Sequence, residues 1–318
     1  MLGIVLVVYK SFEDTVSFVK HELPKIGCPN KAVIVDVAAA LASTQRLAAA
    51  CGGVLVAADA ESVGEGGPFV LHAAANLGYA KGNNLGARFL LRHFPGMQWL
   101  LFSNTDVELL TPRLTEALIA VLQDRADVAC VGPKVLSPDG TEQLPFDKPI
   151  PIGTAMWHNV AFPFLRGRPP WETAYKLRPG TSVGQYCYWV SGCFLMSRAA
   201  DFVAAGMFDE ETFLYGEEVI LSERLRPRER HFYYEPSLEI RHHCGKTISR
   251  YLQNPALARI DLASSLHYYR TYRRANAALI LLFRCCGAIR LLWVRLAYAR
   301  YERRRARALR AEEARSAP

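Results

Sequence analysis

Short apolar runs that end in polar or glycine residues recur along most of the chain. Residues 3–9 and 31–37 are continuous runs rich in Val and Ile, which is typical of strands buried on both faces of a parallel sheet. Shorter apolar runs predict further strands at 54–57, 99–103 and 128–131, and a later one at 188–197.

Amphipathic or helix-favouring segments separate these runs. Helices are predicted at 87–94, 114–122, 199–205 and 217–225, and the SPDG sequence at 137–140 predicts a turn. Residues 145–179 are rich in Pro, Trp, Phe and Arg and show no helical or strand period of apolar residues. This composition predicts an irregular, partly mobile segment over the ligand-binding site. Strands alternating with helices predict an α/β fold whose ligands bind at the carboxyl ends of the strands.

Composition is that of a folded protein. The 318 residues are 51% hydrophobic and 21% charged, which excludes a disordered chain. The length fits one large α/β domain with a tail, or two domains. We predict a catalytic domain at 1–255 and a helical, Arg-rich tail at 256–318.

The net charge of +8 comes from the tail. Residues 270–318 hold thirteen Arg against three Glu, so the rest of the chain is slightly acidic. The apolar stretch at 275–299 contains Arg284, Arg290 and Arg295, each costly at a bilayer centre, so we expect it to lie on an anionic membrane surface. The alternative is a helix packed on the catalytic domain with a solvated Arg end. Nucleic acid is not expected, because the tail has no recognisable motif.

Neither the cysteines nor the amino-terminal residues indicate secretion. Eight cysteines show no CxxC pair and no zinc-site spacing, which favours a reducing compartment. The opening MLGIVLVVYK lacks a basic region and a cleavage site, so we interpret it as a buried strand.

Four segments carry residue types suited to nucleotide-sugar chemistry. They are Val35-Asp36, the Gly- and Asn-rich 76–86, Ser103–Asp106, and 208–218 with its Glu217-Glu218 pair. An acid after the second strand can accept hydrogen bonds from a base or a ribose. A Gly- and Asn-rich turn allows close approach of a ligand, and an acid after the middle strand can hold a divalent cation against a diphosphate.

Each segment taken alone also has a simpler interpretation. A strand-terminal Asp is often a turn residue, Gly and Asn are common in loops, and paired Glu residues can be helix N-terminal charge. Two adjacent carboxylates on a helix point about 100° apart, so only one can face a given proton. The other is expected to cap or to pair, for example with Arg224.

The four segments, in this order, resemble the inverting GT-A glycosyltransferases of family 2, rhamnosyltransferase-like group. The matching text is IVLVVYKS, VIVDVAAA, NLGYAKGNNLG, LLFSNTDVEL, GPKVLSPDG, SGCFLMSR, GMFDEETFLYGEEVILSERL and IRHHCGKT, over residues 1 to 250. The group has the corresponding patterns VxVVxVxYN, VDN, NxGFAxGNNxG, LLxNPD, GPxxxxxDG, GxFLxxR and GxFDExFFLYxEDxDLxxR, followed by a His-containing loop. The resemblance implies a GT-A, Rossmann-like nucleotide-sugar-binding domain with a mixed central sheet. The apolar and Arg residues after it predict an amphipathic helical tail.

The resemblance also implies roles for individual residues. Glu218 falls at the position of the catalytic base, Asp106 and His242 at positions that bind Mg²⁺ or Mn²⁺, and Glu217, Trp189 and Gly192 on the acceptor side. The donor pocket is implied to include Tyr9, Asp36, Asn76, Gly78, Lys81, Asn83, Asn104, Thr105 and Asp106.

The implied reaction is inverting transfer of a sugar, with dTDP-rhamnose favoured as donor, to a glycan or polyprenyl-linked acceptor in surface polysaccharide synthesis. The enzyme would be cytoplasmic and peripheral at the inner face of the plasma membrane. UDP-hexose or UDP-galactofuranose transferases use the same frame. Val37 replaces the amide of the VDN motif and Ile220 replaces an acid two residues after the base. An inactive GT-A binding or scaffold protein is therefore the alternative from a different class.

Overall fold

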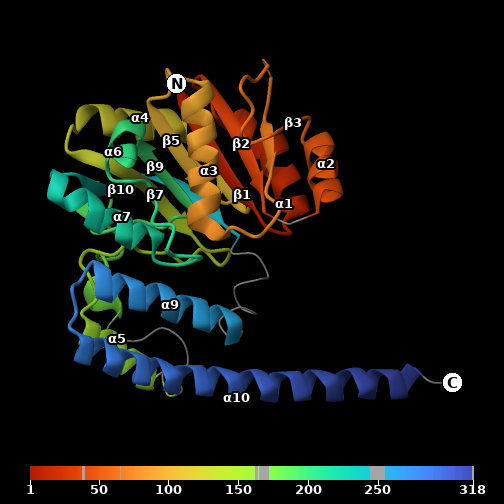
Figure 1. Ribbon diagram of the computed structural model, residues 1–318, viewed down its shortest axis with the longest axis vertical. Helices are drawn as coiled ribbons and strands as arrows, with labels where there is room; N and C mark the ends of the chain where they lie inside the picture. The colour runs from red at the N-terminus through yellow and green to blue at the C-terminus, as the bar shows by residue number, and fades with distance from the viewer. Residues whose placement is uncertain (38–39, 65, 162–163, 165–171, 244–254, 317–318) are drawn as a thin grey trace. The chain divides into compact units, whose positions relative to one another are not determined.

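The computed structural model describes residues 1–37, 40–64, 66–161, 164, 172–243 and 255–316 (Figure 1). The chain divides into two compact units. Met1–Pro149 and Thr173–Cys244 form the first, whereas Ile150–Glu172 and Gly245–Pro318 form the second. This division differs from the predicted boundary at 255/256 in that residues 150–172 group with the carboxy-terminal helices.

A mixed β-sheet is the centre of the first unit. Its strands run in the spatial order β3-β4-β2-β1-β5-β9-β7-β10-β6, with β8 beside β10. The strands from β3 to β5 are parallel neighbours, and β9 pairs antiparallel with both β5 and β7. Their bounds are β1 (Leu2–Val8), β2 (Asn30–Asp36), β3 (Val54–Val56), β4 (Phe69–His72), β5 (Trp99–Ser103), β6 (Val107–Leu109), β7 (Val128–Leu136), β8 (Gln185–Cys187), β9 (Phe194–Arg198) and β10 (His231–His242).

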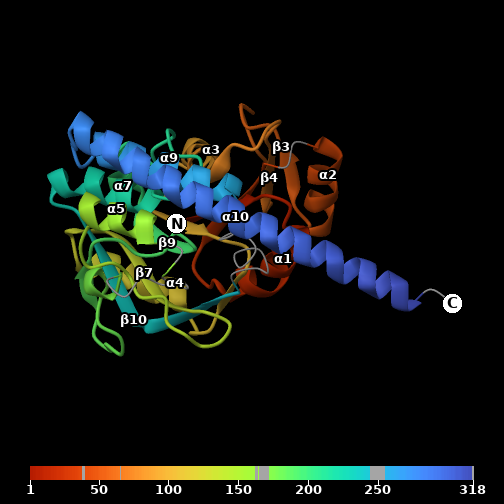
Figure 2. The same cartoon turned by 90° about the horizontal axis from the view of Figure 1, so that it is seen from below.

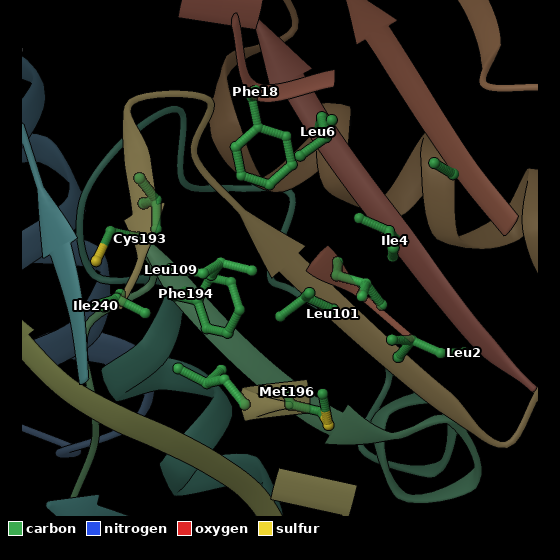
Figure 3. Packing of buried hydrophobic residues seen from close by; sticks show 14 of the residues in the cluster. Leu2, Ile4, Leu6, Phe18, Leu101, Leu109, Cys193, Phe194, Met196 and Ile240 are labelled. Carbon is green, nitrogen blue, oxygen red and sulfur yellow. The ribbon is translucent and has the colours of Figure 1, made fainter. Parts of the chain in front are cut away.

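Helices cover both faces of this sheet. Leu2, Ile4 and Leu6 of β1 pack on one face in a cluster that includes side chains of α2 and α4, and Figure 3 shows Leu6 beside Phe18. Val5 of β1 faces a second cluster that includes side chains of α3, α6 and α7. The bounds are α1 (Phe12–Ser17), α2 (Leu41–Ala50), α3 (Gly78–His93), α4 (Leu114–Asp124), α6 (Ala199–Ala204) and α7 (Glu217–Leu225), with shorter helical turns at Phe18–Glu22, Leu23–Lys25, Glu172–Tyr175 and Arg226–Arg228.

The sheet confirms the predicted α/β class. The strands predicted at 3–9, 31–37, 54–57, 99–103 and 128–131 correspond to β1, β2, β3, β5 and β7, and the predicted helix at 217–225 is α7. The strand predicted at 188–197 is shorter, since pairing with β5 begins only at Phe194. β4, β6, β8 and β10 were not predicted. β10 is interrupted around Glu235–Glu239, where its register with β7 shifts.

The Gly- and Asn-rich segment is helical, and its prediction as a turn is wrong. Residues 78–86 form the first turns of α3. A Cβ on Gly82 would lie 2.9 Å from Val7, and one on Gly86 would lie 2.6 Å from Val5. The glycines therefore let α3 pack closely on β1, and this packing outweighs the low helix propensity of glycine.

The second unit contains the helices α5 (Ile152–Ala161), α9 (Pro255–Thr271) and α10 (Ala277–Ser316). The prediction of irregular structure at 145–179 is wrong for α5, while 162–163 and 165–171 lie outside the described residues. Within this unit α10 packs against α5 and α9, and Figure 1 shows it continuing past the end of α9. A Cβ on Gly287 would lie 2.4 Å from Leu262, so α9 and α10 are in close contact there.

The predicted helical tail is thus two helices with a mostly exposed outer surface. Phe283 and Val294 of α10 are buried and Arg290 pairs with Asp261 at 2.6 Å. By length and composition, the part of α10 at Ala277–Arg305 is able to cross a membrane, and no other helix among the described residues meets that test.

Substitution of Gly86 tests the contact between α3 and β1. Gly86→Ala is expected to destabilise the fold by about 1–3 kcal/mol, because the added methyl meets β-branched side chains in the core. Urea unfolding of the two proteins measures the difference.

Gly153→Ala is the matched control. Gly153 is also helical, in α5, but a Cβ there meets nothing within 4 Å. Helix propensity alone favours alanine by up to about 1 kcal/mol. If Gly86→Ala were as stable as Gly153→Ala, the close packing of α3 on β1 would be disproved.

Candidate functional site

The carboxyl ends of β1, β2, β4 and β5 lie at one edge of the sheet because these strands are parallel neighbours. Tyr9 follows β1 there and is 47% exposed, while Asp36 ends β2 and is 2% exposed. The hydroxyl of Thr44 on α2 donates a hydrogen bond to Asp36 Oδ2 at 2.7 Å. Figure 2 shows α2 beside β3 and β4. Asp36 is thus held in place from a neighbouring helix.

The predicted donor residues of the Asn- and Gly-rich segment surround the start of α3. Asn76 Oδ1 accepts a hydrogen bond from Gly78 N at 3.0 Å, and Asn83 Nδ2 donates to Tyr79 O at 3.0 Å. Gly78 has φ +74°, and a Cβ there would lie 2.1 Å from the carbonyl oxygen of Phe213. Asn76, Gly78 and Asn83 therefore shape the backbone, while the Lys81 side chain is exposed.

The segment 208–216 is fastened to α3 by a residue that the sequence analysis did not single out. Buried Asn84 accepts a hydrogen bond from Phe208 N at 3.1 Å and donates to Phe208 O at 2.9 Å and to Glu210 at 3.0 Å. Tyr79 N also donates to Phe213 O at 2.8 Å. Asn84 lies within the quoted motif, but its spacing from Phe208 along the chain gave no signal of this contact.

Asp106 and His242 meet at the end of β5. His242 Nε2 lies 3.1 Å from Asp106 Oδ1 and 3.3 Å from Asn104 Nδ2. His242 ends β10, and its pairing with Val107 of β6 brings it beside the loop after β5. His242 is 6% exposed and Thr105 is 8% exposed. The structure therefore brings the two predicted metal ligands together, and Asn104 and Thr105 lie in the same loop.

The donor set of this pair suits a divalent cation that is shared with a diphosphate. One carboxylate and one imidazole are ligands that Mn²⁺ accepts, and Mg²⁺ in phosphate sites commonly has only one or two carboxylates from the protein. No cluster of three or more His, Cys, Asp or Glu is arranged for a metal among the residues that the structure describes. Asp106 and His242 therefore fit a cation only with further ligands from a substrate.

Glu218 lies against Gly192, which is in the loop just before β9. A Cβ on Gly192 would lie 2.0 Å from Glu218 Oε1, so a side chain at position 192 would displace the Glu218 carboxylate. Burial raises the pKa of the Glu218 carboxyl, and backbone N–H groups of Glu218 and Gly192 hydrogen-bond to it and oppose that rise. The hydroxyl of Tyr79 donates to the carbonyl of Gly192 at 2.6 Å.

The loop that precedes β9 contacts Glu218 and also the loop that contains Asn104 and Asp106. Gly192 contacts Glu218, and the carbonyl of the next residue, Cys193, accepts a hydrogen bond from Asn104 N at 2.8 Å. Asn104 in turn approaches His242. Asp106 and Glu218 thus both lie at the end of the sheet where β5 ends and β9 begins. Upstream, the ring of the predicted acceptor residue Trp189 stacks on Phe146 with a centroid separation of 4.7 Å.

Glu217 is buried within the first unit. It is 2% exposed, and its Oε1 has no hydrogen-bond partner among the described residues. Burial and the neighbouring Glu218 charge raise the pKa of Glu217 to about 8. The suggested pairing of Arg224 with Glu217 is not formed, because Arg224 pairs with Asp209 at 3.2 Å and bonds to backbone carbonyls of Gly206 and Met207.

Comparison with known proteins identifies relatives in sequence and in fold. No family model matches the chain. The N-acetylglucosaminyl-diphospho-decaprenol L-rhamnosyltransferase of Mycobacterium tuberculosis is 31% identical over 153 residues, which are 48% of this chain and 49% of that protein. The chain thus spans about half the length of the curated relatives it matches.

Solved structures match over most of the chain. A structure of GalNAc-T7 with UDP, GalNAc and Mn²⁺ covers 90% of this chain and 54% of its own, with TM-score 0.50 and 13% identity. The mannosyltransferase PcManGT from Pyrobaculum calidifontis, in complex with GDP-Man and Mn²⁺, covers 98% and 79%, with TM-score 0.50 and 10% identity. The chain has the GT-A fold. In sequence this GT-A chain is rhamnosyltransferase-like, as the motifs predicted.

The stability of this GT-A chain should depend on pH through Glu217. Its folded-state pKa of about 8 lies above the usual 4.5, so the protonated carboxyl is favoured by folding. The associated stability is fully present below pH 4.5 and is lost as the pH rises through 8. Glu217→Gln does not titrate, so its stability relative to the unchanged protein should rise between pH 5 and pH 9, by an amount on the order of a few kcal/mol.

Thermal unfolding at a series of pH values measures this dependence. Glu229→Gln, at an exposed position, is the control and should follow the unchanged protein at every pH. A constant difference in Tm between Glu217→Gln and the unchanged protein from pH 5 to pH 9 would rule out a raised pKa at Glu217.

Proposed function

We propose that the chain is a metal-dependent, inverting glycosyltransferase that moves a rhamnosyl group from dTDP-rhamnose to a hydroxyl of a lipid-linked N-acetylglucosamine acceptor in cell-envelope polysaccharide synthesis. One observation carries the proposal. The Asp106–His242 pair and the Glu218 carboxylate both lie at the end of the sheet where β5 ends and β9 begins. The rhamnosyltransferase resemblance supports the sugar and the acceptor.

In the proposed reaction Glu218 is the general base. Its carboxylate takes the proton of the acceptor hydroxyl while that oxygen bonds to the anomeric carbon. The anomeric bond to the diphosphate breaks on the opposite face, and the nucleoside diphosphate leaves with the bonding electron pair, so the configuration inverts. A divalent cation, when bound by Asp106 and His242, would neutralise charge on the diphosphate. The raised pKa of Glu218 makes it a stronger base than an ordinary carboxylate.

The surrounding residues divide between donor and acceptor. Tyr9, Asp36, Lys81 and Thr105 lie at or near the sheet edge where the donor would bind, with Asn104 next to the metal pair. On the acceptor side, Gly192 leaves room for the Glu218 carboxylate and Trp189 offers an aromatic face for a sugar. Glu217, buried behind the base, would support Glu218 and not contact the acceptor proton.

The alternatives differ in donor or in activity. A UDP-hexose or UDP-galactofuranose donor would use the same Asp106–His242 pair, and an inactive GT-A binding protein would follow from Val37 and Ile220. Ile220 is fully buried, so in this chain its position packs in the core. The Gly192 backbone that accommodates Glu218 favours an enzyme, because a scaffold has no need for a carboxylate held in this way.

The second unit is proposed to bind the cytoplasmic face of an anionic membrane. At 100° per residue, six exposed apolar side chains of α10 fall within about 120° of the helix circumference, while exposed Tyr301 lies outside this range. The six are Leu281, Leu282, Ile289, Leu292, Trp293 and Leu296, each 36–63% exposed. Arg284 and Arg295 lie beside one edge of this apolar stripe, where each could contribute about 1 kcal/mol to anionic lipid binding. Arg290 is on the packed side with Asp261.

Loss of the base should abolish turnover and leave the fold intact. Glu218→Gln is expected to lower turnover of dTDP-rhamnose and a polyprenyl-diphosphate-linked N-acetylglucosamine acceptor by about 10²- to 10⁴-fold. Release of dTDP in the presence of Mn²⁺ or Mg²⁺ is the measurement, with UDP-hexoses and UDP-galactofuranose as competing donors.

Glu211→Gln serves as the control, because Glu211 is an exposed residue of the same segment. It should keep full turnover. Thermal unfolding of both variants establishes that they fold. Full turnover in Glu218→Gln would refute the assignment of the base.

Membrane binding should depend on the apolar stripe of α10. Leu292→Glu is expected to lower partitioning onto phosphatidylglycerol-containing vesicles by about tenfold, since it removes apolar burial and adds repulsion. Vesicle sedimentation measures the bound fraction. Leu41→Glu is the control, with 49% exposure in α2 against 57% for Leu292.

Extraction of membranes with high salt distinguishes a peripheral protein from one with a membrane-spanning helix. High salt should release a peripheral protein, whereas a spanning helix would stay in the membrane. Equal binding of Leu292→Glu and Leu41→Glu to vesicles would count against lipid binding by the apolar stripe of α10. Self-association that is lost only in Leu292→Glu would also count against it, because the stripe would then bind a second copy of the chain.

A further inference from the structure

His72 lies beside Asp36, although none of the predicted motifs includes it. β2 and β4 are parallel, and Asp36 and His72 are register partners at the carboxyl ends of these strands. The main chains are joined by the hydrogen bond from Ala73 N to Asp36 O at 2.9 Å. The two side chains therefore start from adjacent points on the same edge of the sheet.

The Thr44 hydroxyl connects both side chains. Its oxygen lies 2.7 Å from Asp36 Oδ2 and 2.9 Å from His72 Nδ1, and Thr44 is fully buried. A carboxylate can only accept hydrogen bonds, so the single hydroxyl proton goes to Asp36. The hydroxyl oxygen must then accept from Nδ1–H of His72. This network assigns the proton of the neutral imidazole to Nδ1 and leaves Nε2 as an acceptor.

The second ring nitrogen of His72 makes no contact with another polar group in the part of the chain that the structure describes. His72 is partly exposed, and its Nε2 has no hydrogen-bond partner among the described residues. The sheet edge thus presents an imidazole acceptor next to a carboxylate. Diphosphate oxygens carry no protons to donate, whereas uridine and thymidine carry a base N–H and ribose hydroxyls.

The order of strands in the sheet separates Asp36 and His72 from the predicted metal ligands Asp106 and His242. β1 lies between β2 and β5, so the ends of β2 and β5 are two strand spacings apart, about 10 Å. A ligand with its diphosphate at Asp106 and His242 would have its nucleoside toward β2 and β4. The acceptor pair is then on the nucleoside side.

We propose that His72 is a specificity-determining residue that recognises the nucleoside of a uridine or thymidine diphosphate through its Nε2 acceptor, with Thr44 as the positioning residue that fixes the tautomer. The proposal rests on the proposed function, because it assigns the nucleoside end of the same donor site. It adds a residue on β4 to a pocket otherwise predicted from residues at or after the ends of β1, β2 and β5 and around the start of α3.

The variant His72→Asn distinguishes a role in nucleoside recognition from a purely structural role. The amide nitrogen of His72→Asn can take the place of Nδ1 and keep the hydrogen bond to Thr44, but nothing takes the place of Nε2. His72→Ala removes both contacts. His21→Asn, at an exposed position, is the control for a histidine-to-asparagine change elsewhere.

Titration calorimetry with UDP, dTDP and inorganic pyrophosphate, each with Mn²⁺, provides the test. His72→Asn is expected to weaken UDP and dTDP binding by about 5- to 30-fold, the effect of one hydrogen bond, with pyrophosphate affinity and Tm unchanged. Thr44→Val should weaken the same two ligands, and Thr44→Ser should restore them.

The outcomes separate this inference from the proposed function. If the unchanged protein binds UDP or dTDP and His72→Asn binds them equally well, the role of His72 is wrong while the donor site stands. If His72→Asn weakens pyrophosphate as much as the nucleotides, His72 acts on the whole site and the proposal is overturned. If the unchanged protein binds none of the three ligands, both proposals fail.

Discussion

The pairing of β5 with β1 on one side and β9 on the other is the constraint on which the rest of the site depends. The parallel pair directs Ser103 and the following loop toward the edge where β2 ends. The antiparallel pair places Phe194 opposite Ser103, so the loop before β9 arrives at that same edge. Ser103 and Phe194, distant in sequence, therefore meet through backbone pairing alone, without any long-range side-chain contact being needed.

Local patterns in the sequence predicted what is formed locally. The apolar runs gave the central parallel strands, and the order of the segments around Asp36, Asp106 and Glu218 gave the fold class. Strand ends are readable because burial on both faces leaves an uninterrupted apolar run that stops at a polar residue. The role proposed for Glu218 comes from the resemblance, and the structure adds that its carboxylate lies against Gly192.

What the sequence did not reveal depends on distant partners. Glycines 82 and 86 indicate a turn by composition, and only the adjacent β1 explains why they are helical. Asn84 is bonded to Phe208, and His72 is bonded to Thr44 on another element. β10 contains Glu, Pro and Ser in its middle, so its 12 residues show no strand period, yet it delivers His242 to Asp106.

The second unit is discontinuous in sequence, and this affects how the chain can acquire its structure. During synthesis α5 leaves the ribosome long before α10, so for that interval the face it will use has no partner. Contacts between elements so distant in sequence form late, because the closure entropy of the intervening loop comes first. A fragment that stops before α9 would retain α5 without α10, the helix that packs on it. Such a fragment would be prone to aggregation, so the carboxy-terminal tail is an integral part of the folded chain.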